Sequence, residues 1–551
     1  MESQTVGVQT DIVGPLTCLD FELRSLFNDL FWGTCQLAVR GQPNPIRVEH
    51  SGPLRVIAFS DWRIQDIALL AEEIVRLPFK PDLIVYGGDD ISRFIDQGRN
   101  WFAELARCSN YGVCAVAGND DVPGHQKQIT GESVFDVHTM PVILGEFAVL
   151  GIEGAPSPPG LLLHTEKKVY SHLARQKQLV ARKSLILISH CPPRGCLDES
   201  VRFSPDRRPR SIGSHSVRRF VCGNKRVKLV ICGHSHRCGG RHQKLGQALV
   251  VNAASHDAVG NVGRFALITV HASGKAEVQW REIIEVACIP GVKGVSAIQL
   301  RSKGIRTAQE FARSDISTLA AAVPSPARPL EILRARARAL AQRQPVLISP
   351  MKLQSNPEIF LDIETDPDGG YKYVWLIGVC EGRNGRYKAF FANTPAEESR
   401  ILTAFVEFAT QRPTANLLAF SASRFEERVL KKRLSAHSLS MSLCSRIVNL
   451  CQAFHNSVAL PIFSERVTDI AGSLGFRQRH PDLDGLGVAR LYERRYLRET
   501  NAARRRKIRK RLLEYNEDDV QSLPFILDAV ANLSPIFHQP SNFEPPKTQI
   551  T

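Results

Sequence analysis

Seven short apolar runs, separated by segments of helical length, follow one another from Leu54 onward. They read LRVIAFS, DLIVYGG, VCAVAGN, FAVLGIEG, SLILISH, VKLVICGH and ALVVNAA. Runs of this length that are rich in Val, Ile and Leu are typical of buried strands, and the amphipathic stretches between them are typical of covering helices. The alternation predicts a layered α/β domain that ends near Arg281.

A chain of 551 residues is too long for one hydrophobic core, so we expect an α/β protein of several domains. A second α/β block begins with the apolar run EIFLDIE at Glu358 and ends near Leu533. The expected parts are an N-terminal extension (1–53, with a helix over 21–39), a first domain (54–281), a helical connector (283–313), a linker with a helix (314–356), a second domain (357–533) and a disordered tail (534–551).

Net charge and cysteine usage narrow the class of protein. The formal charge is +16, which favours polyanionic partners such as nucleic acid, although charge alone fits a basic protein without such a role equally well. Thirteen cysteines form no C-x-x-C pair, which is typical of reduced thiols in a cytoplasmic protein. We expect no signal peptide and no membrane span, because no apolar run is long enough.

Metal-ligating residue types follow five of the predicted strands of the first domain. Ligands gather at the carboxyl ends of strands in an open α/β sheet. Carboxylate, amide and imidazole groups suit a pair of divalent cations such as Mn, Fe or Zn. The candidate ligands are Asp61, Asp89, Asn119, His190, His234 and His236.

The order D-x-x, GD, GN, H and GHSH resembles that of the calcineurin-like metallophosphoesterases, which form an αββα sandwich. The resemblance implies that Asp61, Asp89 and His236 hold one metal ion. It implies that Asp89 also bridges to a second ion held by Asn119, His190 and His234.

Two positions depart from that family pattern. Arg63 stands where the family has a histidine ligand, and a guanidinium cannot ligate a metal. Asp120 stands where the family has a histidine that acts on the leaving group; a carboxylate serves as a general acid only if its pKa is raised. A weakened or mononuclear site and a merely structural or phosphate-binding remnant both remain open. A zinc site built from Cys191, Cys196, Cys232 and Cys238 is a further alternative, although core thiols fit their spacing better.

Two acids lie two residues apart on the first strand of the second domain. Asp362 and Glu364 share one face of the run FLDIET, because side chains alternate along a strand. Much later in the chain, Tyr515 and Asp519 are spaced i and i+4 in the helical segment LLEYNEDDVQSL and therefore share a helix face. Like charges beside a buried strand repel each other, so a cation is the natural compensation.

This pattern resembles the DnaQ-like exonucleases on the ribonuclease-H fold, and most closely their YprB-type branch, whose LGF and LDG elements stand here within TDIAGSLGFRQRHPDLDGLG. The resemblance implies that Asp362, Glu364 and Asp519 bind Mg or Mn and that Tyr515 orients the attacking water. It also implies a further catalytic acid, for which Glu426 in SRFEERVL is the candidate.

Two segments carry features of nucleic-acid binding. The connector CIPGVKGVSAIQL resembles a helix-hairpin-helix element, in which backbone N–H groups around Gly291, Lys293 and Gly294 face a phosphate. The segment 494–511 contains ten Lys or Arg residues and one acid. For the connector, the alternative is a short pair of helices without a binding role. For the basic segment, the alternative is a solvated helix face. The candidate contacts in the basic segment are Arg505, Arg506, Lys507 and Arg509.

We therefore expect a metal-dependent nuclease that hydrolyses DNA or RNA from a 3′ end through the second domain. One alternative places the chemistry in the first domain, acting on nucleotides or small phosphodiesters. Another treats the first domain as a scaffold in which Arg63 grips a phosphate or a partner.

Overall fold

The structure is a computed structural model that describes residues 45–62, 67–96, 99–180, 182–200, 210–255, 262–271, 273–292, 294–323, 326, 328–351, 356–368, 370–421 and 423–533. The expected helix over 21–39, Arg63, Lys293 and the tail after 533 lie outside these ranges. The chain divides into two compact units: the first ends at Glu282, and the second begins at Ile283.

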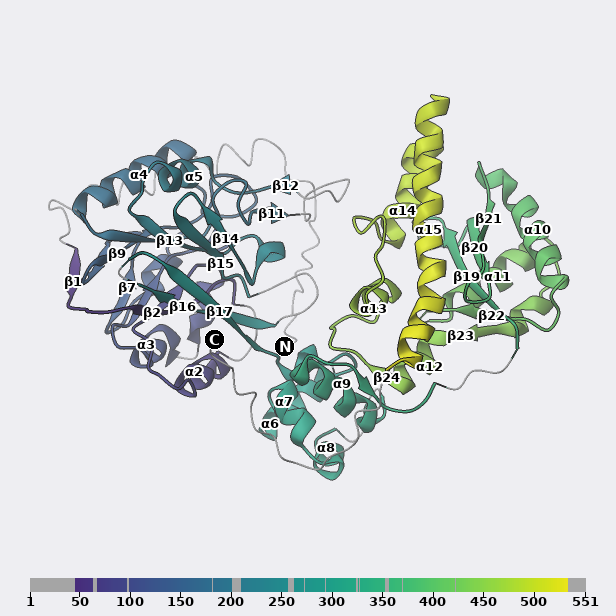
Figure 1. Cartoon of the computed structure of the whole chain (residues 1–551), viewed down its shortest axis with the longest axis horizontal. Coiled ribbons are helices and arrows are strands. Elements are labelled where there is room, and N and C mark those ends of the chain that lie inside the picture. The colour runs from purple at the N-terminus through teal and green to yellow at the C-terminus, as the bar shows by residue number, and fades with distance from the viewer. Residues whose placement is uncertain are drawn as a thin grey trace, which may run out of the picture. The chain divides into compact units, whose positions relative to one another are not determined.

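Two mixed sheets build the first unit (Figure 1). The seven-stranded sheet has the order β1-β8-β9-β10-β13-β15-β14, and the six-stranded sheet has the order β17-β16-β2-β3-β6-β7. Their strands are β1 (Ile46–Val48), β2 (Leu54–Phe59), β3 (Leu83–Tyr86), β6 (Val113–Ala115), β7 (Val134–Asp136), β8 (Val142–Leu144), β9 (Phe147–Ile152), β10 (Ser184–Ser189), β13 (Val227–Cys232), β14 (Arg241–Leu245), β15 (Ala248–Asn252), β16 (Gly263–Val270) and β17 (Ala276–Ile283).

Helices cover the outer faces of this sandwich. They are α2 (Ala68–Val75), α3 (Trp101–Arg107), α4 (Glu166–Leu179) and α5 (His215–Cys222), with the small strand pairs β4 (Ile95–Asp96) and β5 (Arg99–Asn100), and β11 (Glu199–Ser200) and β12 (Arg210–Ser211). Alternation along each strand explains the layers: Ile186 and Ile188 of β10 join the core between the sheets, and Leu185 and Leu187 pack under α4 and α5. The predicted αββα sandwich is confirmed.

Parallel pairing brings the ends of the strands together. β2, β3, β6 and β7 are parallel neighbours, as are β9, β10, β13 and β15. A parallel bridge between Ser60, directly after β2, and Ala254, after β15, joins the carboxyl ends of the two sheets. The residues that follow these strands therefore meet at one edge of the sandwich.

A helical segment opens the second unit. It consists of α6 (Val295–Ser302), α7 (Ala308–Arg313), α8 (Ile316–Ala322) and α9 (Leu330–Gln342), which share one core that includes Leu300, Phe311, Leu319 and Leu333. Thr307 begins α7 with a capping box: its hydroxyl accepts from the Glu310 N–H, and the Glu310 side chain accepts from the Thr307 N–H.

A five-stranded mixed sheet forms the body of the second unit, in the order β21-β20-β19-β22-β23. The elements are β18 (Val346–Leu347), β19 (Glu358–Thr365), β20 (Val374–Glu381), β21 (Tyr387–Phe391), α10 (Glu398–Thr410), β22 (Asn416–Ala419), α11 (Phe425–Ala436), β23 (Ile447–Asn449), α12 (Leu450–Ser457), β24 (Val458–Ala459), α13 (Val467–Ser473), α14 (Gly485–Leu491) and α15 (Ala502–Ala531). No helix among the residues that the structure describes is both long and apolar enough to cross a membrane.

The two faces of β19 have different partners. Ile359, Leu361 and Ile363 belong to the large core that also contains residues of α10 and α11, whereas Phe360 packs with Leu523 and other residues of α15. Asp362 and Glu364 follow Phe360 at intervals of two and therefore lie on the face that α15 covers. The packing of α15 thus sets where Asp519 meets the strand acids.

Replacing Leu523 tests this anchor. Leu523 is 3% exposed and lies one helical turn after Asp519, so we expect Leu523→Ala to lower the free energy of unfolding of this domain by about 2–5 kcal/mol. Denaturant unfolding followed by circular dichroism measures the change. The control is Leu486→Ala on α14, where the side chain is 37% exposed and the expected change is within about 0.5 kcal/mol. An equally small effect at Leu523 would contradict the anchor.

Candidate metal centres

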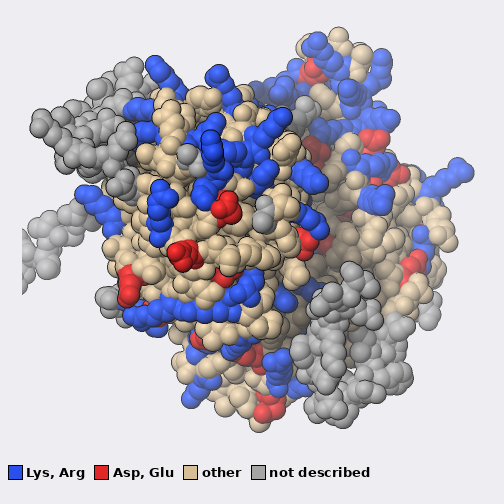
Figure 2. Space-filling view, turned by 60° about the vertical axis from the view of Figure 1, so that its left-hand side comes forward, with Lys and Arg blue, Asp and Glu red and all other residues tan. Residues whose placement is uncertain are grey.

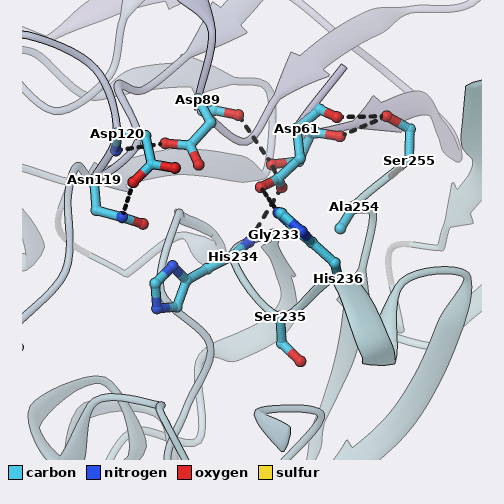
Figure 3. Close-up of polar contacts among 12 residues, drawn as sticks. Asp61, Asp89, Asn119, Asp120, Gly233, His234, Ser235, His236, Ala254 and Ser255 are labelled. Atoms are coloured by element: carbon cyan, nitrogen blue, oxygen red, sulfur yellow. Dashed lines mark hydrogen bonds and ion pairs between the residues drawn. The ribbon is translucent and has the colours of Figure 1, made fainter. Parts of the chain in front are cut away.

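Asp61 and His236 form one side of the site at the edge of the sandwich (Figure 3). Nε2 of His236 lies 3.0 Å from Oδ1 of Asp61, while Oδ2 of Asp61 accepts from the Ser60 hydroxyl at 2.7 Å and from the His234 N–H at 3.1 Å. Asp61, Asp89 and His236 each offer a ligand atom, all within 4.8 Å of one another. This is the set predicted for the first ion.

Asn119, His190 and Asp89 form the other side. Nδ1 of His190 lies 2.8 Å from the Gly87 carbonyl oxygen; in the neutral ring its proton therefore sits on Nδ1, and Nε2 keeps a lone pair. That Nε2 lies 2.8 Å from Oδ1 of Asn119 and 3.5 Å from Oδ1 of Asp89. The Asn119 amide is oriented by its Nδ2, which donates to the Pro159 carbonyl oxygen at 3.1 Å. Oδ1 of Asn119, Nε2 of His190 and Oδ1 of Asp89 thus converge, and because all three are electron-pair donors they could bind a cation between them.

His234 is the remaining predicted ligand of the second ion. Its ring centroid lies 5.3 Å from that of His190, and in Figure 3 it lies on the Asn119 side of the site. Asp61, Asp89 and His234 have backbone φ angles of 52°, 69° and 61°, in the left-handed region that non-glycine residues rarely adopt. Backbone strain of this kind is concentrated at functional sites, where the surrounding fold holds it.

Burial drives the electrostatics of this site. It raises the pKa of Asp89 well above the ordinary value, and the charges of Asp61, Asp120 and Asp121 raise it further. Burial also acts to raise the pKa of Asp61, but the hydrogen bond with His236 and the nearby imidazoles outweigh it, so this pKa is lowered. The pKa of His234 falls to about 3, through burial and then the charge of His190. The imidazole of His234 is therefore neutral, which is the form that binds a metal.

Asp120 lies at the exposed rim, and its neighbour Asp121 is buried. Oδ1 of Asp120 accepts from the Asn119 amide at 2.6 Å, and its N–H donates to Asp89 at 2.9 Å. Sequence reasoning missed Asp121, which accepts from the N–H groups of Gly118 at 2.8 Å and Asp89 at 3.2 Å. Asp121 therefore ties the GGDD loop to the GNDD loop; the doubled aspartate of GNDD was its only sequence signal.

Glycine is required at Gly118 and Gly233 by close approach. A Cβ at Gly118 would lie 1.9 Å from Oδ1 of Asp89, and one at Gly233 would lie 2.3 Å from Oδ2 of Asp61. The glycines of the GN and GH motifs thus let the backbone run against the ligand carboxylates.

The cysteines near this site are core thiols. Cys191, Cys196, Cys232 and Cys238 are buried, and burial raises the pKa of the Cys196 thiol to about 11 and that of Cys232 well above its usual value. None of them belongs to a candidate metal group within the described ranges. The alternative of a cysteine zinc site therefore finds no support.

Asp362, Glu364 and Asp519 form the centre of the second unit. One oxygen from each lies within 4.8 Å of the others, with Glu364 6% and Asp519 8% exposed. Burial, and after it the mutual repulsion of the acids, raises the pKa of Asp362 and of Glu364 well above their usual values. The pKa of Asp519 rises to about 7, mainly through burial. One Asp519 oxygen is buried without a hydrogen-bond partner. The donor set and the uncompensated charge fit hard divalent cations.

Two further side chains orient these acids. The Tyr515 hydroxyl, one turn before Asp519, hydrogen-bonds to it, as its predicted position implied. Sequence reasoning missed Asn516, which is fully buried and donates to Oδ2 of Asp362 at 2.6 Å while accepting from the Tyr387 hydroxyl at 2.8 Å. Gly378, paired with Asp362 across the sheet, leaves the room: a Cβ there would lie 1.9 Å from Oδ1 of Asn516.

Glu426 is not brought into the three-acid group. It lies in the first turn of α11, 4% exposed, and accepts from the Ser421 hydroxyl at 2.5 Å. Burial raises its pKa, and its charge adds to the field at Asp362. Its role as a fourth acid stays a prediction.

The predicted nucleic-acid contacts differ in their surroundings. Arg505 donates to the Asn393 carbonyl at 3.1 Å and lies over the Tyr496 ring, and Arg509 lies over the Phe391 ring. Arg506 and Lys507 are exposed. On the face of the molecule shown in Figure 2, Lys and Arg are more abundant than Asp and Glu.

In the connector, Gly291 and Gly294 have φ angles of 99° and 50°. Gly294 is the N-cap residue of α6 and has no side chain that could cap the first N–H groups of that helix.

Two protein families match the chain over separate ranges. The calcineurin-like phosphoesterases match residues 54–238, and the RNase H superfamily matches residues 359–531. No curated protein matches the chain.

Two solved structures are similar at low levels. One shares 19% identity over 41% of this chain and 98% of its own, with a TM-score of 0.31. The family B DNA polymerase from the hyperthermophilic archaeon Pyrobaculum calidifontis shares 14% identity over 50% of this chain and 44% of its own, with a TM-score of 0.25. Likenesses at these scores support no argument about this chain.

The two family matches agree with the two resemblances read from the motifs, so both predictions of family are confirmed. The chain carries an N-terminal calcineurin-like phosphoesterase domain and a C-terminal YprB-type domain of the RNase H superfamily.

Proposed function

We propose that the protein is a metal-dependent nuclease whose C-terminal domain hydrolyses the phosphodiester bonds of DNA or RNA from a 3′ end. The observation that carries the proposal is the convergence of Asp362, Glu364 and Asp519 in a buried site that raises the pKa of all three. Structural ion pairing does not explain the group, because within the described ranges no Lys or Arg forms an ion pair with these acids. Membership of the RNase H superfamily supports a nucleic-acid substrate.

Mg or Mn ions, which this set of acids suits, would supply an activated water and neutralise the charge on the phosphate. The chain's own residues hold the geometry. Asn516 fixes the Asp362 carboxylate by donating to one oxygen and leaving the other toward the site. The Tyr515 hydroxyl hydrogen-bonds to Asp519, and we assign it the role of orienting the attacking water. Glu426, whose charge acts on Asp362 from α11, is assigned as a further catalytic acid outside the three-acid group.

Substrate binding is assigned to basic residues and to the helical connector. Arg506 and Lys507, exposed on α15, would contact backbone phosphates. The start of α6 after Gly294 would bind a further phosphate through its backbone N–H groups, and Gly291 and Lys293 precede it in the sequence.

Replacing Asp362 tests the C-terminal site. Asp362→Asn removes one metal ligand while keeping the shape of the side chain, so we expect cleavage of an end-labelled single strand in Mg or Mn to fall at least about 100-fold. Asp368→Asn is the matched control, because Asp368 is exposed and pairs with Lys372; it should keep full activity. Wild-type activity in Asp362→Asn would refute the assignment.

The raised pKa values give a second test in metal-free protein. The folded state holds Asp519 protonated up to about pH 7, whereas the unfolded state releases that proton near pH 4. The folded state thus binds more protons between these values, and its stability falls as pH rises through this window. We expect Asp519→Asn to remove part of this pH-dependent loss of stability. The free energy of unfolding of the variant should therefore increase relative to that of wild type between pH 5 and pH 8, by on the order of 2 kcal/mol.

Thermal unfolding at several pH values, with and without Mg, measures this difference. Added Mg should stabilise wild type at pH 8, because the ion binds only the folded site. It should stabilise Asp519→Asn much less, because that variant lacks one of the proposed ligands. A difference between the two proteins that shrinks as pH rises would contradict the raised pKa of Asp519.

A second activity is proposed for the N-terminal domain, namely hydrolysis of nucleotides or small phosphodiesters. The convergence of Oδ1 of Asn119, Nε2 of His190 and Oδ1 of Asp89 supports it. The alternative is a domain that only binds a phosphate or a partner, with Arg63 in place of a ligand.

Asp89→Asn separates the two possibilities. In the enzymatic case, Mn-dependent hydrolysis of bis(p-nitrophenyl) phosphate by wild type falls at least about 100-fold in Asp89→Asn. The rate persists in Asp362→Asn and in the control Glu199→Gln, an exposed acid of the same domain. If wild type does not hydrolyse the diester, or if Asp89→Asn hydrolyses it normally, the scaffold alternative stands.

A further inference from the structure

A third group of ligand-type side chains lies in the first unit and belongs to neither centre described above. His138 lies in the turn after β7, Glu153 directly follows β9, and His164 lies in the loop before α4. One ligand atom from each lies within 4.8 Å of the others. All three are buried, with exposed fractions of 4%, 1% and 8%. Three separate segments therefore deliver one ligand each to a single point.

The Glu153 carboxylate is the feature that requires an explanation. Oε1 of Glu153 lies 3.3 Å from Nε2 of His138 and 3.5 Å from Nε2 of His164. Neither of its oxygens accepts a hydrogen bond from the residues that the structure describes. Burying a carboxylate without hydrogen bonds or a paired charge is costly. A cation between the carboxylate and the two imidazoles would remove this cost.

Room for an ion and water lies beside the group. A cavity of about 280 Å³ is lined by His138 and His164 and, on α4, by Lys168, Ser171 and Arg175. The ring of His172 stacks on that of His138, with centroids 4.1 Å apart and planes 10° apart. His172 therefore supports His138 and limits its ring to one orientation.

One contact opposes metal binding at His138. A ligating Nε2 requires the proton on Nδ1, and that atom lies 3.4 Å from the backbone nitrogen of Glu153. The contact is at the far limit of hydrogen bonding and is weak, so its loss costs little compared with the bond to a metal.

The loop between Glu153 and His164 also reaches the strand-end site. The N–H groups of Leu161 and Leu162 both donate to the Asn119 carbonyl, at 2.6 and 3.0 Å, and the Pro159 carbonyl accepts from the Asn119 side chain. Both ends of this loop are held at the His–Glu–His group. An ion there would fix the loop that orients Asn119.

We propose that His138, Glu153 and His164 bind one Zn²⁺ ion, with the fourth position open to the cavity, and that this ion holds the 153–164 loop against Asn119. Two imidazoles and one carboxylate are a donor set that zinc prefers, and an open fourth position leaves room for water. The ion is separate from those of the strand-end site, because none of its ligands is shared with that site.

Zinc stoichiometry in the full-length chain tests the proposal. The background is Asp89→Asn with Asp362→Asn, which removes a ligand from each of the two other centres. After equilibration with Zn²⁺ and desalting, elemental analysis should find one zinc ion per chain in the background, and none after His164→Ala is added. His242→Ala is the matched control, an exposed histidine of the same domain, and should keep the ion. A background protein without zinc, or a His164→Ala protein that retains it, would overturn the proposal.

Glu153→Gln guards against a folding defect, because it keeps the size of the side chain and removes only its charge. It should retain the circular dichroism spectrum of the background and weaken zinc binding at least about tenfold; unchanged binding counts against Glu153 as a ligand. Hydrogen exchange tests the loop. Zinc should slow exchange at Leu161 and Leu162 in the background and have no such effect in His164→Ala. Equal exchange with and without zinc would refute the link to Asn119.

Discussion

The repulsion among three carboxylates, two of them buried and one partly buried, is the constraint on which the C-terminal domain depends. Asp362 and Glu364 are fixed on one face of β19 by the core on its other face, and α15 brings Asp519 against them. The donors that reach this group, Asn516 and Tyr515, are neutral. The packing of β19 and α15 therefore holds these acids together against their mutual repulsion, which a bound cation or a proton compensates.

The N-terminal centre solves the same problem differently. Asp61 receives hydrogen bonds from Ser60 and the His234 backbone and a contact from His236, and its pKa is lowered. Asp89 accepts from backbone N–H, and its pKa is raised by burial and by neighbouring acids. The donors and charges around each carboxylate thus decide the direction of its pKa shift, although both carboxylates are buried.

Much of both sites could be predicted because local rules place their residues. Parallel strands put Asp61, Asp89, Asn119 and His190 at one edge, and helical periodicity puts Tyr515 beside Asp519. Asn516 and Asp121 could not be predicted this way, because their partners are set by tertiary packing: Asn516 reaches Asp362, 154 residues earlier in the chain. The expected strands stop at ALVVNAA, so sequence reasoning also missed β16, which pairs antiparallel with β2. The apolar residues of β16 are visible in the sequence, but its pairing with the distant β2 is set by the tertiary fold.

The basic segment of α15 contains two kinds of residue, although the sequence shows a single run of charge. Arg505 and Arg509 are four residues apart and therefore share a helix face, and both guanidinium groups lie over aromatic rings of the domain, Tyr496 and Phe391. Arg506 and Lys507 lie on the exposed side. Arg505 and Arg509 pack the helix against the domain, although Arg509 is also exposed, and Arg506 and Lys507 face solvent. Because the basic stretch ends at Arg511, four residues before Tyr515, the proposed phosphate contacts and Asp519 lie on one continuous helix.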